Sequence, residues 1–348
     1  MSIRYATEDE IHRWDEHLAA NPDGGNVFQM CEMAEAKRNN GWKPQYIICG
    51  DLAITVLEKY IPLLGKFWYL PKGPGVTDVP TLLTVITPLR EFAHQQGVFV
   101  VKIEPEIIES DEAYSALNEA GFTPSSPVQP NHSTVIVDLA PSLDDIMASF
   151  NQKGRNALRR AEREGVTTRA VPLTDESMQT MYDLLASTAA GRFDASLRSF
   201  SYYKDFWQRY SESGHGSLFF AEYEGRVVAS AFCMYVGQKG LYKDGASVRD
   251  KVVYGASHLL QWEVIKWMKD HGVTSYDLCG SPHSRDSNDA KNPFYGIGKF
   301  KTSFHKHITD YVGCYDVVIH PRAYRRWKQL GERLCLSLSW RLKHRQWY

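Results

Sequence analysis

The sequence predicts an α/β protein built from two related domains. Short apolar runs that are typical of strands alternate with segments of helical periodicity along the chain, and one order of elements occurs twice. The 348 residues are enough for two domains that each bury a core. Hydrophobic residues make up 43% of the chain and charged residues 23%, which excludes a disordered or fibrous protein.

The first half of the chain begins with helices and continues with strands. Helical spacing covers 8–20 and 30–39, and β-rich runs cover 45–49, 52–61 and 67–70. A helix from Pro80 to Gln96 is expected next, because proline is favoured in a first helical turn and a glycine such as Gly97 just after a helix end. Buried strands are expected at 98–103 and 134–139.

The second half repeats this order. Helices are expected at 174–190, 200–213 and 256–270, and strands at 217–223, 227–236, up to Tyr242, and at 273–278. The run Tyr69–Gly73, a helix and the strand after Gly97 correspond to Leu241–Gly245, a helix and the strand after Gly272. This repeat favours two related domains over one long sheet.

The composition also narrows the function. A net charge of −1 provides no overall attraction to nucleic acid or acidic lipid, so such a partner needs a local basic patch. The six cysteines have no CxxC or zinc-site spacing, which indicates free thiols in a reducing compartment. The first residues do not form a signal peptide, and no run reaches the roughly 18 apolar residues of a membrane span. A cytoplasmic protein is therefore expected.

No phosphate loop, dinucleotide fingerprint, zinc-protease motif or hydrolase elbow occurs in the sequence, so scattered side chains must carry any chemistry. Arg155, Arg159 and Arg163 stand four residues apart on a predicted helix. Like charges one turn apart repel, so this stripe indicates an anionic partner. The alternative is a solvated helix, which Glu162 and Glu164 would help to stabilise.

Three further clusters have alternative interpretations. Arg198 and Tyr202 lie one helical turn apart and are spaced to hold an oxyanion, or else their segment serves packing. Lys299 and Lys301 lie beside aromatic residues and glycines, which suits either a partly desolvated cation or a solvated loop. Lys37 ends a predicted helix and by itself predicts only a cap.

The C-terminal segment is strongly basic. From Pro321 to Trp347 it has eight Lys or Arg residues, one acidic residue (Glu332) and three tryptophans. A basic helix of this kind either rests on an anionic membrane surface or packs on the core with a solvated basic face.

Taken together, five short motifs resemble the FemABX peptidyltransferases, which build the interpeptide bridge of bacterial peptidoglycan with aminoacyl-tRNA as donor. The motifs are Tyr69–Pro74, Lys153–Gly165, Asp244–Ser247, Tyr276–Gly280 and Tyr295–Phe304. The resemblance extends from about Gln29 to about Asp316.

The resemblance implies an α/β (α+β) fold of two tandem acetyltransferase-like (GNAT-type) domains, with mixed sheets flanked by helices. The first domain would comprise residues 1–140 with a returning C-terminal helix at 317–348, and the second residues 141–316. No stretch has room for the coiled-coil arm of the longer members. The chain therefore resembles the compact FemX type, which attaches the first residue of a bridge.

The family's functional residues carry over onto matching positions. Lys37 matches the lysine used on the diphosphate of a muropeptide precursor, Arg198 and Tyr202 match the Arg-x-x-x-Tyr pair of that site, and Phe300-Lys301 match the Phe-Lys at the transferred group. Phe99 and Asp244 stand where compact members have site tyrosines, so two ring hydroxyls are absent. Tyr242 is a further expected substrate contact.

The implied reaction is aminolysis of an ester by a stem-peptide amine, with no covalent enzyme intermediate, no metal and no cofactor. Lys301 would stabilise the oxyanion, and Asp244 is the candidate general base. Aminoacyl-tRNA phosphates would contact Lys153, Arg155, Arg159 and Arg163. The acceptor would be UDP-MurNAc-pentapeptide or lipid II.

A monomer is expected, with peripheral contact at the inner face of the plasma membrane through the C-terminal helix. Two alternatives compete with the aminoacyltransferase. One is an N-acyltransferase that uses acyl-CoA, for which Val253–Ala256 is the best but a poor pyrophosphate turn. The other is a non-catalytic protein that binds tRNA or a cell-wall precursor.

Overall fold

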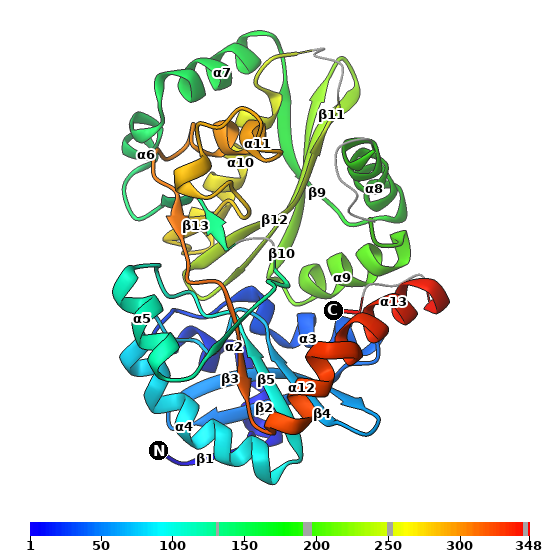
Figure 1. Ribbon diagram of the computed structural model, residues 1–348. Coiled ribbons are helices and arrows are strands. Elements are labelled where there is room, and N and C mark those ends of the chain that lie inside the picture. Colours follow the sequence, from blue (N-terminus) through cyan, green and yellow to red (C-terminus); the bar gives the residue numbers. More distant parts are fainter. Residues whose placement is uncertain (130–131, 191–196, 249–252, 344–346) are drawn as a thin grey trace. The chain divides into compact units, whose positions relative to one another are not determined.

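A computed structural model describes residues 1–129, 132–190, 197–248, 253–343 and 347–348 (Figure 1). The chain forms two compact units, Met1–His132 with Tyr311–Tyr348 and Ser133–Asp310. The units change at 132/133 and 310/311, which lies before the expected boundaries at 140/141 and 316/317. The pairing of two strands explains the difference. Strand β8 (Ile136–Asp138) pairs within the second unit, and β15 (Cys314–Val318) pairs with two strands of the first.

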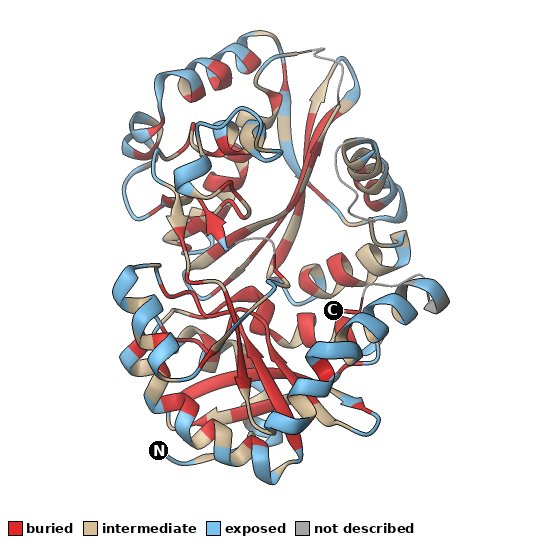
Figure 2. Cartoon of the chain, in the orientation of Figure 1, coloured by how far each residue is buried: buried red, intermediate tan, exposed pale blue. Residues whose placement is uncertain are grey.

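The first unit is built on a seven-stranded sheet in the order β1-β2-β3-β4-β5-β15-β6. Its other strands are β1 (Ile3–Tyr5), β2 (Lys43–Cys49), β3 (Leu52–Ile61), β4 (Gly65–Leu70), β5 (Val98–Ile103) and β6 (Thr123–Ser125). Strands β4 and β5 run parallel, and the other neighbours are antiparallel. Figure 2 shows the central strands as almost wholly buried.

The first unit also contains helices that range from three to seventeen residues. They are α1 (Glu8–His12), α2 (Trp14–Ala19), the 3₁₀ helix η1 (Val27–Gln29), α3 (Cys31–Arg38), α4 (Val79–Gln95), α5 (Asp111–Glu119), α12 (Pro321–Arg326), the π-helix η3 (Trp327–Gly331) and α13 (Glu332–Lys343). The predicted helix at 80–96 is confirmed as α4, which begins where the Asp78 side chain accepts a hydrogen bond from the Thr81 amide at 2.7 Å.

The predicted helix at 8–20 is divided at Arg13 into α1 and α2. The break coincides with Trp14, a fully buried residue whose indole N–H donates to the Thr55 hydroxyl at 2.7 Å. The helix is interrupted at Arg13, and the Trp14 ring next to the break is held in the core. The sequence pattern could not show this, because both pieces have helical spacing.

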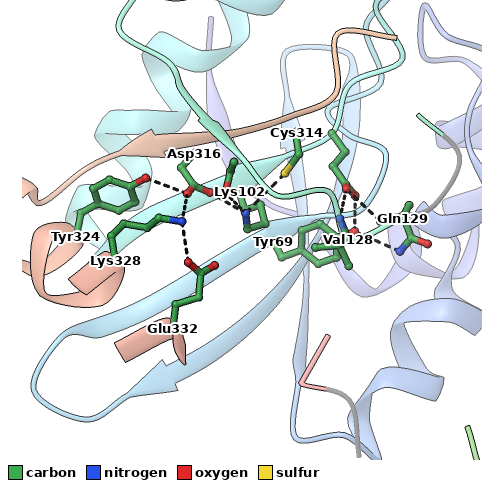
Figure 3. Close-up of polar contacts among 11 residues, drawn as sticks. Tyr69, Lys102, Val128, Gln129, Cys314, Asp316, Tyr324, Lys328 and Glu332 are labelled. Atoms are coloured by element: carbon green, nitrogen blue, oxygen red, sulfur yellow. Dashed lines mark hydrogen bonds and ion pairs between the residues drawn. The ribbon is translucent and has the colours of Figure 1, made fainter. Parts of the chain in front are cut away.

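A buried ion pair joins β5 to β15. Lys102 and Asp316 are each 1% exposed and are direct partners in the antiparallel register, with Nζ 3.0 Å from Oδ1 (Figure 3). Burial lowers the pKa of Lys102, but the Asp316 carboxylate and neighbouring Cys314 more than offset this, so the net shift is upward. Tyr324 of α12 donates to Asp316 at 3.0 Å, which ties the C-terminal helices to the sheet.

The second unit has a six-stranded sheet in the order β8-β13-β12-β11-β10-β9. Its other strands are β9 (Thr167–Val171), β10 (Gly216–Tyr223), β11 (Arg226–Val236), β12 (Lys239–Ser247) and β13 (Ser275–Asp277), and β7 (Ser133–Thr134) and β14 (Thr309–Asp310) form a separate pair. Its helices are α6 (Leu143–Ser149), α7 (Gln152–Arg163), α8 (Asp175–Ala189), α9 (Phe200–Glu212), α10 (Ala256–Asp270), the 3₁₀ helix η2 (Ser284–Asp286) and α11 (Tyr295–Lys301).

The predicted repeat is confirmed. In the first unit α4 connects the parallel strands β4 and β5, and in the second α10 connects the parallel strands β12 and β13. Each parallel pair is followed in the sheet by an antiparallel neighbour from a distant segment, β15 or β8. The two units thus share one arrangement of strands.

One strand is longer than predicted. β12 was expected to end at Tyr242 but continues to Ser247, because a bulge allows it to keep pairing with β11. Phe232 pairs with Asp244 and Cys233 with Tyr242, which leaves Lys243 as the extra residue. None of the described helices is both long enough and apolar enough to span a lipid bilayer.

The Lys102–Asp316 pair leads to a stability prediction. Lys102→Met leaves the Asp316 charge buried, so the free energy of unfolding should fall by about 3–5 kcal/mol. Adding Asp316→Asn should recover part of this loss, because the amide carries no charge but still accepts a bond from Tyr324. Urea unfolding measures both changes. The control is Arg38→Met, which removes an exposed ion pair with Glu35 and should lower the free energy of unfolding by less than about 1 kcal/mol. Equal losses in Lys102→Met and Arg38→Met would contradict the prediction.

Candidate functional site

The carboxyl ends of two parallel strands separate in the second unit. The β12–β13 register ends at Leu241 opposite Asp277, and beyond it β12 enters its bulge while the other chain turns away. The turn includes Cys279 at φ +59° and Gly280 at φ +34°. In α/β sheets ligands bind where the carboxyl ends of strands diverge, so this is the natural place to look for chemistry.

Lys301 reaches this turn from the last residue of α11. The residue is only 8% exposed, and its ammonium donates to the carbonyl oxygens of Cys279 and Gly280, the latter at 2.6 Å. Its Nζ also lies 6.0 Å from the ring centroid of Tyr242. Burial lowers the pKa of Lys301, and the nearby Cys279 and Asp277 oppose this shift only in part.

The turn that holds Lys301 is fixed by Asp277. One carboxylate oxygen accepts the Cys279 amide N–H at 2.6 Å and also the hydroxyl of Thr134 from β7. A cysteine at positive φ is strained unless its surroundings hold it. Because the amide is pulled toward Asp277, the following carbonyl groups face the Lys301 ammonium.

Tyr242 lies beside this centre. A side chain at Gly245 would overlap the Tyr242 phenol, so the glycine provides the space that the ring occupies. Burial raises the pKa of Tyr242, which therefore keeps its hydroxyl proton at neutral pH. Tyr276 in β13 is fully buried and donates its hydroxyl proton to Gln261 at 2.7 Å.

Asp244 forms a second polar group on the bulge. It is 8% exposed, and its two oxygens accept hydrogen bonds from the Trp207 indole at 3.0 Å and the Lys243 ammonium at 2.9 Å. Burial lowers the pKa of Lys243, but the Asp244 carboxylate and the hydroxyls of Tyr203 and Tyr202 outweigh burial and raise it overall. Both Asp244 oxygens thus hold neighbouring side chains.

Helix α9 connects this group to the predicted oxyanion pair. The Arg198 guanidinium lies 4.5 Å from the ring centroid of Tyr202, and the Tyr182 hydroxyl donates to the Arg198 carbonyl at 3.1 Å. The pKa of Tyr203, raised mainly by burial, is also influenced by Asp244, Lys243 and Arg198. Arg198, Tyr202 and Asp244 therefore all lie close enough to Tyr203 to influence its pKa.

Two parts of the chain match known protein families. Residues 10–119 match the model of the FemAB family, and residues 148–291 match that of an acetyltransferase (GNAT) domain. The lipid II:glycine glycyltransferases of Staphylococcus aureus (strain MRSA252) and Staphylococcus epidermidis are each 22% identical, covering 95% and 94% of this chain and 97% of each relative. The chain is thus similar to FemABX proteins over nearly its whole length.

Solved structures agree with this similarity in their fold. The crystal structure of FemX has a TM-score of 0.79 at 20% identity, covering 94% of this chain and 99% of that chain. L-PGS from Bacillus licheniformis has a TM-score of 0.53 at 17% identity, covering 95% and 98%. The predicted α/β fold of two GNAT-like domains is therefore confirmed, and an acyltransferase is the activity class that the family and fold support.

The remaining predicted residues have different surroundings. In the first unit, Lys37 is buried in the last turn of α3. Phe99 has no exposed surface and packs against the rings of Phe67 and Trp327, so the structure shows a core role for it. Phe300 of the second unit packs against His258, whose pKa burial lowers to about 4.

The predicted tRNA-binding stripe is divided by its contacts. Lys153, Arg159 and Arg163 are exposed on α7. Arg155 instead donates to the backbone carbonyls of Ala148 and Phe150, so its guanidinium holds the turn before the helix. The helical spacing is as predicted, but only part of the stripe faces solvent.

Sequence reasoning assigned no role to Asp277 or Thr134, and no signal assigned one to Thr134. The motif Tyr276–Gly280 contains Asp277, and a carboxylate at the end of a strand just before Cys-Gly was the available signal. A buried cluster in the first unit was also missed. There Glu104 accepts hydrogen bonds from the Tyr69 hydroxyl at 2.5 Å and from the amides of Val128 and Gln129 at 2.6 and 3.1 Å.

The role of Asp277 in holding Lys301 is open to test. Asp277→Asn removes a carboxylate that attracts the Lys301 ammonium, so the pKa of Lys301 should fall further, as an NMR titration of its side chain would show. The free energy of unfolding should fall by about 1–3 kcal/mol. Asp286→Asn, at an exposed position of η2, should leave both unchanged. An unaltered Lys301 titration in Asp277→Asn would contradict this role.

Proposed function

We propose that this protein is a FemABX peptidyltransferase, which transfers an aminoacyl group from aminoacyl-tRNA to the side-chain amine of a peptidoglycan stem peptide. The observation that carries the proposal is the buried Lys301 ammonium at the diverging ends of β12 and β13. Relatives named for glycine transfer to lipid II, similar over nearly their full length, support this substrate class.

The chemistry is aminolysis of an ester. The acceptor amine attacks the aminoacyl carbonyl carbon, a carbon–nitrogen bond forms, and the bond to the ribose oxygen of the tRNA breaks. The amine proton leaves during attack, and the ribose oxygen takes up a proton as it departs. The intermediate carries a negative oxygen, which a fixed ammonium in a water-poor site stabilises by roughly 3 kcal/mol.

Lys301 is suited to this stabilisation. An ammonium has three donors, and two of them bind the Cys279 and Gly280 carbonyl oxygens. No third acceptor for it is found among the residues that the structure describes. The third donor is thus already oriented by its neighbours, and it can meet the developing oxyanion with little reorganisation.

Asp244 fits a positioning role better than that of the general base. Its two oxygens already accept bonds from Trp207 and Lys243, so a proton taken from substrate would displace one of these donors. In this proposal Asp244 keeps Lys243 and α9 in place, beside Arg198 and Tyr202, which we assign to the acceptor's diphosphate. The acceptor amine is deprotonated through the substrate or solvent.

The acyl-CoA alternative fits this chain less well. Acyl-CoA enzymes bind pyrophosphate at a strand–helix junction, on the free amides of a helix start. In the second unit that helix is α10, and a side chain at its N-terminal Gly255 (φ +91°) would overlap the carbonyl of Ala157 in α7. The start of α10 is therefore packed against another helix.

The direct test is a mass spectrum of two acceptors after incubation with the protein and a pool of charged tRNAs. UDP-MurNAc-pentapeptide and lipid II are assayed in parallel, with uncharged tRNA and acetyl-CoA as separate controls. A gain of one aminoacyl mass on either acceptor, with charged tRNA only, supports the proposal and identifies the amino acid. No gain on either, or a gain with acetyl-CoA, contradicts it.

Lys301 should control turnover rather than acceptor affinity. Lys301→Met should lower kcat about 100-fold with little change in acceptor KM, because the lost interaction forms at the oxyanion. The Lys301 pKa is lowered by burial, so wild-type activity should fall as pH rises through a value below the ordinary 10.5 of lysine. Lys301→Arg, which stays charged, should shift that fall to higher pH. Equal effects of Lys301→Met on kcat and KM would argue against the role.

Helix α7 should supply phosphate contacts. Arg159→Gln with Arg163→Gln should weaken binding of aminoacyl-tRNA and reduce the dependence of log affinity on log salt by about two. Filter binding across a salt series measures both. Arg155→Gln is the matched control from the same helix, because its guanidinium binds backbone carbonyls; it should lower stability but not the salt dependence. The same salt dependence in all variants would contradict this assignment.

A further inference from the structure

The C-terminal helices of the first unit expose leucines to solvent. Leu330 is 68% exposed, Leu334 55% and Leu338 50%. The three residues stand four apart, which places them along one helical face. A helix packed on a globular core normally turns its apolar face inward, so this exposed row requires another explanation.

The inward contacts of the same segment are made by other residues. Trp327 is 1% exposed and packs against the rings of Phe67 and Phe99. Lys328 lies 3.9 Å from the buried Asp316 and 2.7 Å from Glu332 (Figure 3). The segment is therefore anchored by an aromatic ring and by ion pairs, and its leucines are not needed to hold it in place.

Arginines surround the leucine row. Arg326, Arg333 and Arg341 are exposed, and each stands three or four residues from one of the leucines. No ion pair of these arginines is found within the described part of the chain. We call Leu330, Leu334, Leu338 and these three arginines the leucine–arginine face. Figure 2 shows α13, on which most of it lies, as largely exposed.

A strand turn of the same unit continues the apolar surface. A side chain at Gly331 would begin 3.4 Å from Cδ1 of Leu64, so the turn between β3 and β4 adjoins η3. In that turn Leu63 is 94% exposed, at φ +66°. Exposed apolar groups from two elements thus lie near one another, and large exposed apolar patches mark interaction sites.

We infer that the leucine–arginine face, with Leu63, docks this protein on the surface of an anionic phospholipid bilayer. Leucines on one helical face enter the boundary of the acyl chains, while flanking arginines bind lipid phosphates. A second copy of the chain is a poorer partner, because the arginines of two such faces would repel each other. RNA is also poorer, because it leaves the leucines exposed to water.

The docking face does not depend on the proposed function. Of the two alternatives for the basic segment, the buried Trp327 and Trp347 agree with packing on the core, so these rings are not available for a contact with lipid. The exposed leucines take that place. Arg345, part of the predicted basic segment, lies outside the described residues.

The test is co-sedimentation of the full chain with vesicles. Phosphatidylcholine vesicles are compared with vesicles containing about one-third phosphatidylglycerol, because arginines near a surface respond to anionic lipid. Wild-type protein should sediment with the anionic vesicles at least about tenfold more than with the neutral ones, and added salt should weaken this binding.

Three variants separate the contributions. Replacing Leu330, Leu334 and Leu338 with Gln should lower vesicle binding at least about tenfold, and so should replacing Arg326, Arg333 and Arg341 with Gln. Glutamine is a good helix former, so both variants should keep the wild-type circular dichroism. Ile108→Gln is the matched control. Ile108 is also an apolar residue of the first unit that is exposed (65%), but it follows the last residue of β5. The strand after the Leu63 turn instead bonds to Gly97, just before the first residue of β5.

Three results would overturn the inference. The first is no binding of wild-type protein to anionic vesicles at low salt. The second is an equal loss of binding in Ile108→Gln. The third is a concentration-dependent dimer that the leucine variant disperses, with no vesicle binding, which would assign the face to a second copy of the chain. None of these measurements uses aminoacyl transfer, so failure here is distinct from failure of the proposed function.

Discussion

The separation of two parallel strands in a mostly antiparallel sheet sets the geometry of the candidate site. A parallel pair requires a crossover connection, and α10 supplies it between β12 and β13. Pairing stops after Leu241 and Asp277, so backbone groups past that point no longer bond across the strands. Such groups need other partners when buried, and in this protein the Lys301 ammonium is one of them.

The two buried lysines Lys102 and Lys301 show how the groups around an ammonium set the direction of its pKa shift. Lys102 faces a carboxylate directly across the strands, and its pKa is raised. Lys301 faces backbone carbonyls, which carry only partial charges, and burial lowers its pKa. The first arrangement joins two strands of a sheet, whereas in the proposed reaction the second would place a cation beside a developing negative charge.

The proposed aminoacyl transfer and the inferred docking on a membrane surface are compatible with each other. The proposed reaction needs an acceptor that occurs in a soluble or a lipid-linked form, and the inferred docking face would bring the first unit to the membrane surface. The two conclusions rest on different units and different residues. Lys301 and Asp277 carry the first, and the leucine–arginine face carries the second.

The sequence by itself determined the fold class, the repeat of strand, helix and strand, and the family resemblance. These depend on local periodicity and on turn residues such as Gly97 and Gly272, which act over a few neighbours. It also indicated Lys301, Arg198 and Tyr202 as one set of candidates, through the resemblance.

Tertiary structure alone decided which of these side chains meet a partner and which face water. Arg155 turned to backbone carbonyls, and Asp277 became the support of a strained turn, because bonds to Ala148, Thr134 and Cys279 depend on how distant segments pack. The exposure of Leu330, Leu334 and Leu338 was equally hidden. Periodicity shows that a helix has an apolar face, but only the packing around Trp327 shows that this face points outward.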